Sequence, residues 1–353
     1  MTSDFVLGTD YTFDAAGMVR EGRFDPSVLL APPGDQPALF DLPAGVPLGG
    51  LAVPARRVAA MTWPQREARI QQLLNFADLL FYQASWSARN DGGPRTVVAV
   101  AGMLSGGNDS TAAVYAMRPH LTHLIHADTG VCLAVTREFT VKVAADLGIP
   151  LLIPRAPRPE DSYVAMVREH GFPGPGRHAR MMNRLKERAW RAARKELVTD
   201  GWRQRMIQVA GRRRDESAAR ADVPEMQRDR SVVWVSPMVL WTKLDLNTWR
   251  RMHAGIPPAL SGYRYRVGER RQGPIPRNPV YDNLHYSGEC ICGAKSRPGE
   301  REWLFEWFGD DPAVQLIREL EAELAGREDI PPEYRIWGAG GGPDRCTTGL
   351  CND

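Results

Sequence analysis

The chain has 353 residues, of which 43% are hydrophobic and 25% are charged, and its formal net charge at pH 7 is +3. This composition is typical of a globular protein, and the small net charge gives by itself no argument for a nucleic-acid partner. No apolar run reaches the roughly 18 residues that span a bilayer, and the first residues lack the basic and apolar regions of a secretory signal, so we expect a cytoplasmic protein without a membrane partner.

The first predicted elements are an arm, a helix and a strand. Residues 1–60 are rich in Pro and Gly, which predicts an extended arm without regular elements. Residues 63–86 carry apolar side chains near helical spacing, and Pro64 is placed to open that helix. Residues 96–102 form a β-branched run that is typical of a buried parallel strand.

Strands and helices then alternate. After a polar turn and a helix, apolar runs at 120–130 and 149–156 flank a helical pattern at 137–148. This β-α-β-α-β order predicts an α/β fold with a doubly wound, mostly parallel sheet, whose ligands bind at the carboxyl ends of the strands. The predicted domains are the arm at 1–60, a nucleotide-binding domain with its N-terminal helix at 61–260, and a cysteine-bearing segment at 261–353.

The polar turn after the first strand is the strongest local signal. Residues 105–110 read SGGNDS, and a helix is predicted directly after them. Glycines leave backbone N–H groups free to point at one spot, and a helix N-terminus attracts anions, so the turn is suited to phosphate. The lysine-bearing Walker pattern is absent. Taken alone, the hexamer would favour an ordinary Gly-Ser turn between strand and helix.

Four further motifs follow in order. They are HADTG at 126–130, GRRRDES at 211–217, SPMVLWTKLDLNTW at 236–249 and NPVYDNLHYSGECICG at 278–293. With SGGNDS, they resemble the motifs of the phosphoadenosine phosphosulfate (PAPS) reductase-like branch of the PP-loop ATP pyrophosphatases. The resemblance covers roughly residues 95–293.

The resemblance implies a role for each motif. The loop would hold the β and γ phosphates of ATP, and Asp109 would offer a carboxylate to Mg²⁺. Arg213 would meet phosphate through its bidentate fork, and Asp128 would contact metal or nucleotide unless it only caps the next helix. The 236–249 segment is expected to be a structural helix start. The remaining residues expected to bind the nucleotide are Ser105, Gly106, Gly107, Ser110, Thr111, Thr129, Gly130, Gly211, Glu216 and Ser217.

Four of the five cysteines form two close pairs, Cys290 with Cys292 and Cys346 with Cys351. In a cytosolic chain such pairs suggest metal rather than disulfides. We expect a 4Fe–4S cluster on all four thiols, with zinc as the alternative, and unligated cysteines stay open as well. Cys132 follows the D-T-G motif and either carries a persulfide or is a small buried side chain.

The chain departs from the family at two motifs, and the absence of the second one argues against sulfonucleotide reduction. Met182, in RMMNRLKER, stands where cluster-bearing members have a cysteine, so Cys346 and Cys351 are expected to complete the ligand set. The E-C-G-[LI]-H motif of assimilatory reductases does not occur. The resemblance therefore implies an ATP pyrophosphatase that adenylates an acceptor for sulfur transfer, with DNA phosphorothioate modification preferred.

The implied partners are a cysteine desulfurase as sulfur donor and a nucleic acid, with DNA preferred and tRNA as the alternative; a homo-oligomer stays open. Arginine runs that begin near 211 and 266 would hold the strand. The competing functions are a PAPS or APS (sulfonucleotide) reductase, a tRNA thiolase and a nucleotide-gated binding module.

Overall fold

The structure is a computed structural model, and it describes residues 5–6, 12–13, 55–90, 95–216, 220–255 and 275–339. Most of the predicted arm lies outside these residues. Its described parts are an antiparallel pair, β1 (Phe5–Val6) with β2 (Thr12–Phe13), and a short helix, α2 (Ala55–Ala60). The helix departs from the expectation of an extended arm, because its sequence ARRVAA is rich in good helix formers.

Six strands form one mostly parallel sheet in the order β5-β4-β3-β6-β8-β7, which confirms the predicted α/β fold. Their bounds are β3 (Thr96–Met103), β4 (His123–Ile125), β5 (Leu151–Leu152), β6 (Gln204–Val209), β7 (Met226–Asp229) and β8 (Val232–Val235). Strand β3 pairs in parallel with β6, β6 with β8, and β4 with β5, whereas β7 runs antiparallel to β8. The polar turn at 105–110 and the D-T-G motif follow the carboxyl ends of β3 and β4, as predicted.

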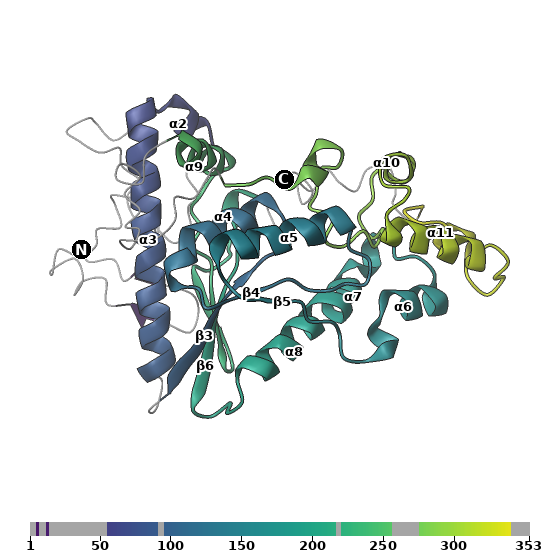
Figure 1. The fold of residues 1–353 in the computed structure, drawn as a ribbon, viewed down its shortest axis with the longest axis horizontal. Helices are drawn as coiled ribbons and strands as arrows, with labels where there is room; N and C mark the ends of the chain where they lie inside the picture. Colours follow the sequence, from purple (N-terminus) through teal and green to yellow (C-terminus); the bar gives the residue numbers. More distant parts are fainter. Residues whose placement is uncertain are drawn as a thin grey trace. The chain divides into compact units, whose positions relative to one another are not determined.

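The main helices are α3 (Trp63–Asn90), α4 (Asn108–Met117), α5 (Ala134–Leu147), α6 (Tyr163–His170), α7 (His178–Met181), the π-helical η6 (Met182–Glu187), α8 (Arg188–Leu197), α9 (Lys243–Gly255), α10 (Glu300–Trp307) and α11 (Pro312–Leu324) (Figure 1). Helix α3 begins at the predicted residue, with Pro64 in its first turn. In the described part of the chain, no helix combines the length and the apolarity needed to cross a membrane.

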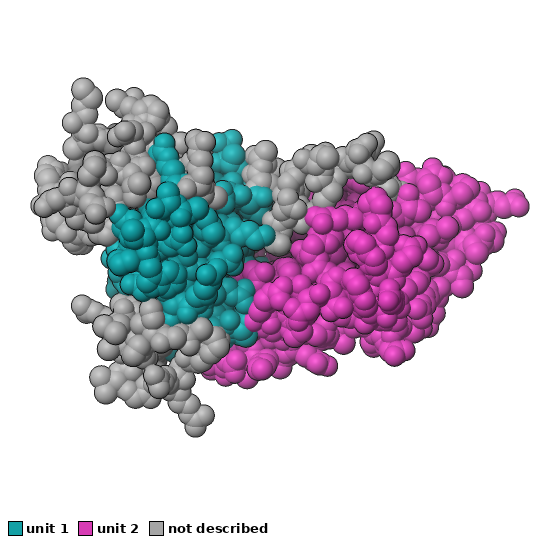
Figure 2. Space-filling view, turned by 90° about the horizontal axis from the view of Figure 1, so that it is seen from above, with its two compact units in different colours: residues 1–103, 109–122, 200–276 teal, residues 104–108, 123–199, 277–353 magenta. Residues whose placement is uncertain are grey.

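The chain divides into two compact units, coloured separately in Figure 2. Unit 1 comprises residues 1–103, 109–122 and 200–276, and unit 2 comprises residues 104–108, 123–199 and 277–353. Each unit is therefore assembled from stretches that are far apart in the sequence.

In unit 1, α3 packs on α9 and on strands β3, β6 and β8. A buried ion pair fastens the two helices, since Arg69 Nε lies 3.0 Å from Asp245 Oδ1. Asp245 Oδ2 also accepts a 2.7 Å hydrogen bond from the backbone N–H of Thr242, the residue just before α9. The rings of Trp241 and Trp249 pack edge to face in the core, 6.3 Å apart. These contacts give the 236–249 segment the structural role that the sequence predicted.

In unit 2, α6 packs against α11 over an apolar core. Asp161, just before α6, is fully buried and forms salt bridges with both Arg184 and Arg188. These salt bridges hold the π-helical turn η6 in place. Such π-helical turns are often found at functional sites. The same turn brings Lys186 into a salt bridge with Glu289, the residue before the first cysteine of the C-x-C pair.

Candidate functional site

The polar turn at 105–110 has a geometry that only glycine tolerates at its second residue. Gly106 has φ +77°, and a Cβ there would lie 2.9 Å from Thr136 Cγ2. The next N–H, of Gly107, donates to Ser105 Oγ at 3.3 Å. Helix α4 begins one residue later, so its first N–H groups face the turn. This is the arrangement of an anion-binding helix N-terminus.

Asn278, the first residue of the N-P-x-Y motif, anchors this turn from a sequence distance of 172 residues. Its Nδ2 lies 3.2 Å from Gly106 O, 3.0 Å from Thr136 Oγ1 and 3.1 Å from Ser287 O. Its Oδ1 accepts a hydrogen bond from Val280 N at 3.1 Å. The sequence analysis did not assign Asn278 to the site, although its motif was part of the resemblance.

Asp109 and Arg213, the two residues expected to meet metal and phosphate, are brought together in unit 1. Arg213 Nε donates to Asp109 Oδ1 at 2.9 Å and Nη2 donates to Oδ2 at 3.0 Å, with both side chains buried. The carboxylate thereby fixes the guanidinium in one orientation. Arg213 Nη1 has no hydrogen-bond partner in the described residues and lies 3.7 Å from Asp215 Oδ2.

Thr111 supplies a second unsatisfied polar group. Its side chain is only 1% exposed, and Oγ1 has no hydrogen-bond partner within the ranges that the structure describes. Buried polar atoms in folded proteins are nearly always hydrogen-bonded, so two such groups beside the start of α4 point to a polar ligand.

Gly211 is the first residue of the G-x-R motif, and backbone atoms pack so closely against it that no side chain fits there. A Cβ at this position would lie 2.5 Å from Asp109 O and 2.7 Å from Ser110 N. The backbone of the motif therefore lies directly against the first turn of α4. Glu216 forms a salt bridge with Arg220, and Ser217 lies outside the described residues.

The side chains of the three arginines that follow Gly211 all contact other residues of unit 1. Arg213 binds Asp109 as described, and Arg214 pairs with the buried Glu225 at 3.2 Å. The Arg212 guanidinium lies 4.8 Å from the centre of the Trp234 ring, a cation–π contact. This run is therefore built largely into the fold, whereas the run that begins near 266 lies outside the described residues.

Asp128, at the D-T-G motif in unit 2, is held by two arginines. Arg155 Nη2 lies 2.6 Å from Oδ2, and Arg137 Nη2 lies 2.9 Å from Oδ1. Burial opposes ionisation, but the Gly130 N–H and these guanidinium groups hold the pKa of Asp128 below its usual value.

Asp128 does not cap the next helix, because α5 begins after Leu133 and has no side-chain cap. The sequence analysis missed Arg137 and Arg155. The place of Arg155 just after β5, at the carboxyl end of a strand, is the signal that could have found it.

The C-x-C pair lies in a densely bonded part of unit 2. Thr129 Oγ1 donates to Glu289 O at 2.8 Å, which joins the D-T-G motif to the residue before Cys290. A hydrogen bond from Cys290 lowers the pKa of Cys292 to about 7, and the same bond, with burial, raises the pKa of Cys290. No group of three His, Cys, Asp or Glu side chains arranged for a metal occurs in the described stretches. The other expected pair, at 346 and 351, lies outside them.

Cys132 is buried and poorly suited to carry sulfur. Its Sγ donates to Leu133 O at 3.4 Å and lies 3.7 Å from His126 Nε2. Burial and the nearby Glu289 carboxylate raise its pKa to about 12, so the nucleophilic thiolate is scarce at neutral pH. Of the two readings of this residue, the structure favours the small buried side chain.

Comparison with known proteins identifies the domain that these motifs build. Residues 99–266 match the family described as phosphoadenosine phosphosulfate reductase domain. Among solved structures, the chain is similar to the phosphate complex of the PAPS reductase from Candida auris, with 14% identity and a TM-score of 0.37 over 66% of this chain and 93% of that one. No curated protein sequence matches. The match covers just under half of the chain, and residues 99–266 are therefore similar to a phosphoadenosine phosphosulfate reductase domain.

Proposed function

We propose that the protein is an ATP pyrophosphatase that adenylates an acceptor for sulfur transfer. The observation that carries the proposal is the pair of buried, unsatisfied groups in unit 1, Arg213 Nη1 and Thr111 Oγ1. Both are hydrogen-bond donors, and with the N–H groups of the α4 N-terminus they suit the oxygens of a polyphosphate.

The chemistry divides into two displacements. An acceptor oxygen attacks the α-phosphorus of ATP, the bond to the bridging oxygen breaks, and pyrophosphate leaves. The terminal sulfur of a desulfurase persulfide then attacks the acceptor atom, and that oxygen leaves with AMP. A thiol reductant cleaves the remaining S–S bond, which frees the carrier cysteine and leaves the sulfur on the acceptor. Arg213, oriented by Asp109, would neutralise the charge that develops on the departing pyrophosphate.

Mg²⁺ fits the residues present, since it commonly binds one or two carboxylates together with phosphate oxygens. Asp109 would hold it, because each of its oxygens accepts one bond from Arg213 and keeps a further lone pair. The bound ion would neutralise part of the negative charge of the phosphates. For an iron–sulfur cluster or zinc, Cys290 and Cys292 would provide two ligands, and we assign no step to that centre.

A backbone phosphate oxygen of DNA is our preferred acceptor, with a tRNA base as the alternative. Mass spectrometry of nucleic acid from cells with and without the gene tests this choice. Phosphorothioate linkages that vanish with the gene support DNA. Thiolated tRNA bases that vanish instead would move the assignment to tRNA.

The decisive experiment on the purified protein measures pyrophosphate release from ATP. Thr111→Val removes a hydroxyl that bonds to no described protein group, so it should leave folding intact and slow release about tenfold or more. Arg213→Lys should cost about 1.5–3 kcal/mol in transition-state binding, because an ammonium group cannot reproduce the fork. Release by both variants at the wild-type rate would place the nucleotide elsewhere.

The name of the matched domain favours a second candidate, sulfonucleotide reductase. Such an enzyme shares the phosphate-binding turn but consumes no ATP. Thioredoxin-dependent release of sulfite from PAPS or APS, without pyrophosphate release from ATP, would establish it in place of the proposed function.

A further inference from the structure

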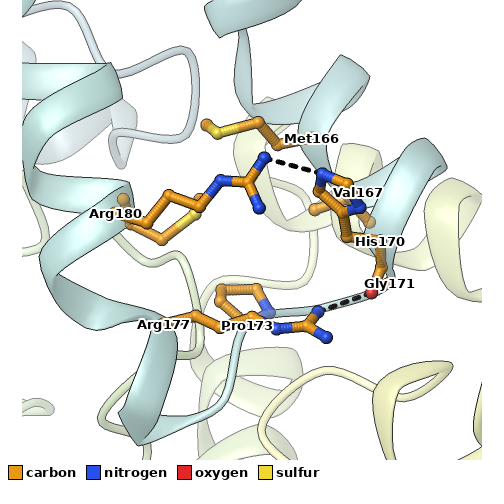
Figure 3. Close-up of a pocket in the computed structure, with 8 residues that line it drawn as sticks. Met166, Val167, His170, Gly171, Pro173, Arg177 and Arg180 are labelled. Atoms are coloured by element: carbon orange, nitrogen blue, oxygen red, sulfur yellow. Dashed lines mark hydrogen bonds between the residues drawn. The ribbon is translucent and has the colours of Figure 1, made fainter.

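A shallow hollow, open to solvent, lies on unit 2 between α6 and the start of α7 (Figure 3). Apolar side chains form its wall, contributed by Met166, Val167, Pro173 and Met181. Its polar lining consists of His170, Arg177 and Arg180, and it includes no acidic residue. None of these residues belongs to the phosphate-binding turn or its partners.

Both arginines are held in defined positions (Figure 3). Arg177 Nη1 donates to His170 O at 2.6 Å, and its guanidinium carbon lies 4.4 Å from the centre of the Tyr334 ring. Arg180 Nη2 lies 2.7 Å from His170 Nε2, which accepts the bond when the imidazole is neutral. Because a guanidinium has five N–H donors, each arginine keeps several for a ligand.

In the described ranges, neither Arg177 nor Arg180 forms a salt bridge with a carboxylate. By contrast, Arg168 on α6 pairs with Glu323 at 2.9 Å. The acidic side chain next to this group is Glu169, whose Oε1 lies 3.4 Å from His170 Nε2 and whose side chain is 68% exposed. Two guanidinium charges therefore stand beside an apolar wall.

The backbone beside the hollow is fixed before any ligand binds. Gly171 has φ +75°, and a Cβ there would lie 2.5 Å from Tyr334 O. Phe172 N donates to the same carbonyl at 2.7 Å, and Gly171 N donates to Val167 O at 2.8 Å. A preformed site loses little conformational entropy on binding.

We propose that this hollow binds the phosphate group of a small phosphate ester. Arg177 and Arg180 donate to the phosphate oxygens, and the apolar wall covers the organic part of the ester. Two guanidinium forks favour phosphate over a carboxylate, because phosphate offers more acceptor oxygens. The proposal stands independently of the proposed function.

Methionine methyl NMR on the full-length protein tests the site, because Met166 and Met181 lie in its wall. Their signals are assigned with Met166→Leu and Met181→Leu, and the probes are phenyl phosphate, inorganic phosphate and benzoate. Phenyl phosphate should shift both signals and bind more tightly than the other two probes. Arg180→Gln should weaken its binding about tenfold or more.

Arg168→Gln is the matched control, since it removes a charge from the neighbouring helix α6 that is already paired with Glu323, and it should leave the affinity unchanged. The proposal is overturned if phenyl phosphate shifts neither signal, or if folded Arg180→Gln binds it as the wild type does. Equal affinity for benzoate would overturn the choice of phosphate. Equal affinity for inorganic phosphate would overturn the role of the apolar wall.

Discussion

Replacing Gly211 with alanine should displace the start of α4 and disable nucleotide binding. The new Cβ would lie 2.5 Å from Asp109 O, while ordinary contact begins at 3.4 Å, so the backbone must move by about 0.9 Å. A misplacement near 1 Å costs roughly 10²-fold in rate, or about 2.7 kcal/mol. The overlap itself should lower the free energy of unfolding by about 1–3 kcal/mol.

The assay combines pyrophosphate release with the Kd of a non-hydrolysable ATP analogue, and Tm verifies that the variant is folded. Gly201→Ala in the same unit is the matched control, because its Cβ would meet no atom within 4 Å and its φ is not positive. The control should behave as the wild type. If folded Gly211→Ala binds and turns over ATP as the wild type does, the packing of this motif against α4 has no part in the site.

Three further variants or reagents test other contacts. Asp245→Asn should lower the free energy of urea unfolding by about 3–5 kcal/mol, because it removes the carboxylate charge that faces the buried Arg69 guanidinium; a difference near zero would contradict the structural role of the pair. Asn278→Ala removes the bond to Gly106 O and should weaken nucleotide binding about tenfold, and an unchanged Kd would show that the turn needs no such anchor. In reduced, metal-free protein, alkylation of Cys292 should rise with pH through about 7 as its thiolate forms, while Cys132, with a pKa of about 12, stays unmodified. Peptide mass spectrometry measures both rates, and faster labelling of Cys132 than of Cys292 would refute this order of their pKa values.

The local parts of the site could be read from the sequence because short-range patterns encode them. A β-branched run, two adjacent glycines and a helical pattern in that order predict a strand, an anion-binding turn and a helix N-terminus. The structure places β3, Gly106 at positive φ, and α4 in that order. The alternation of strands and helices likewise predicted the α/β fold, and the order of the motifs predicted the family that residues 99–266 match.

Tertiary structure decided which partners these residues have. Asp109 meets Arg213 across 104 residues of sequence, and Asn278 reaches Gly106 across 172. The sequence predicted Arg213 only as a phosphate ligand, whereas folding also makes it the partner of Asp109. It predicted the arginine run after Gly211 as a surface for nucleic acid, whereas much of that run is buried or stacked. Spacing along the chain fixes side-chain direction over a few residues, but which distant groups meet depends on how strands and helices pack, and that packing is a property of the whole fold.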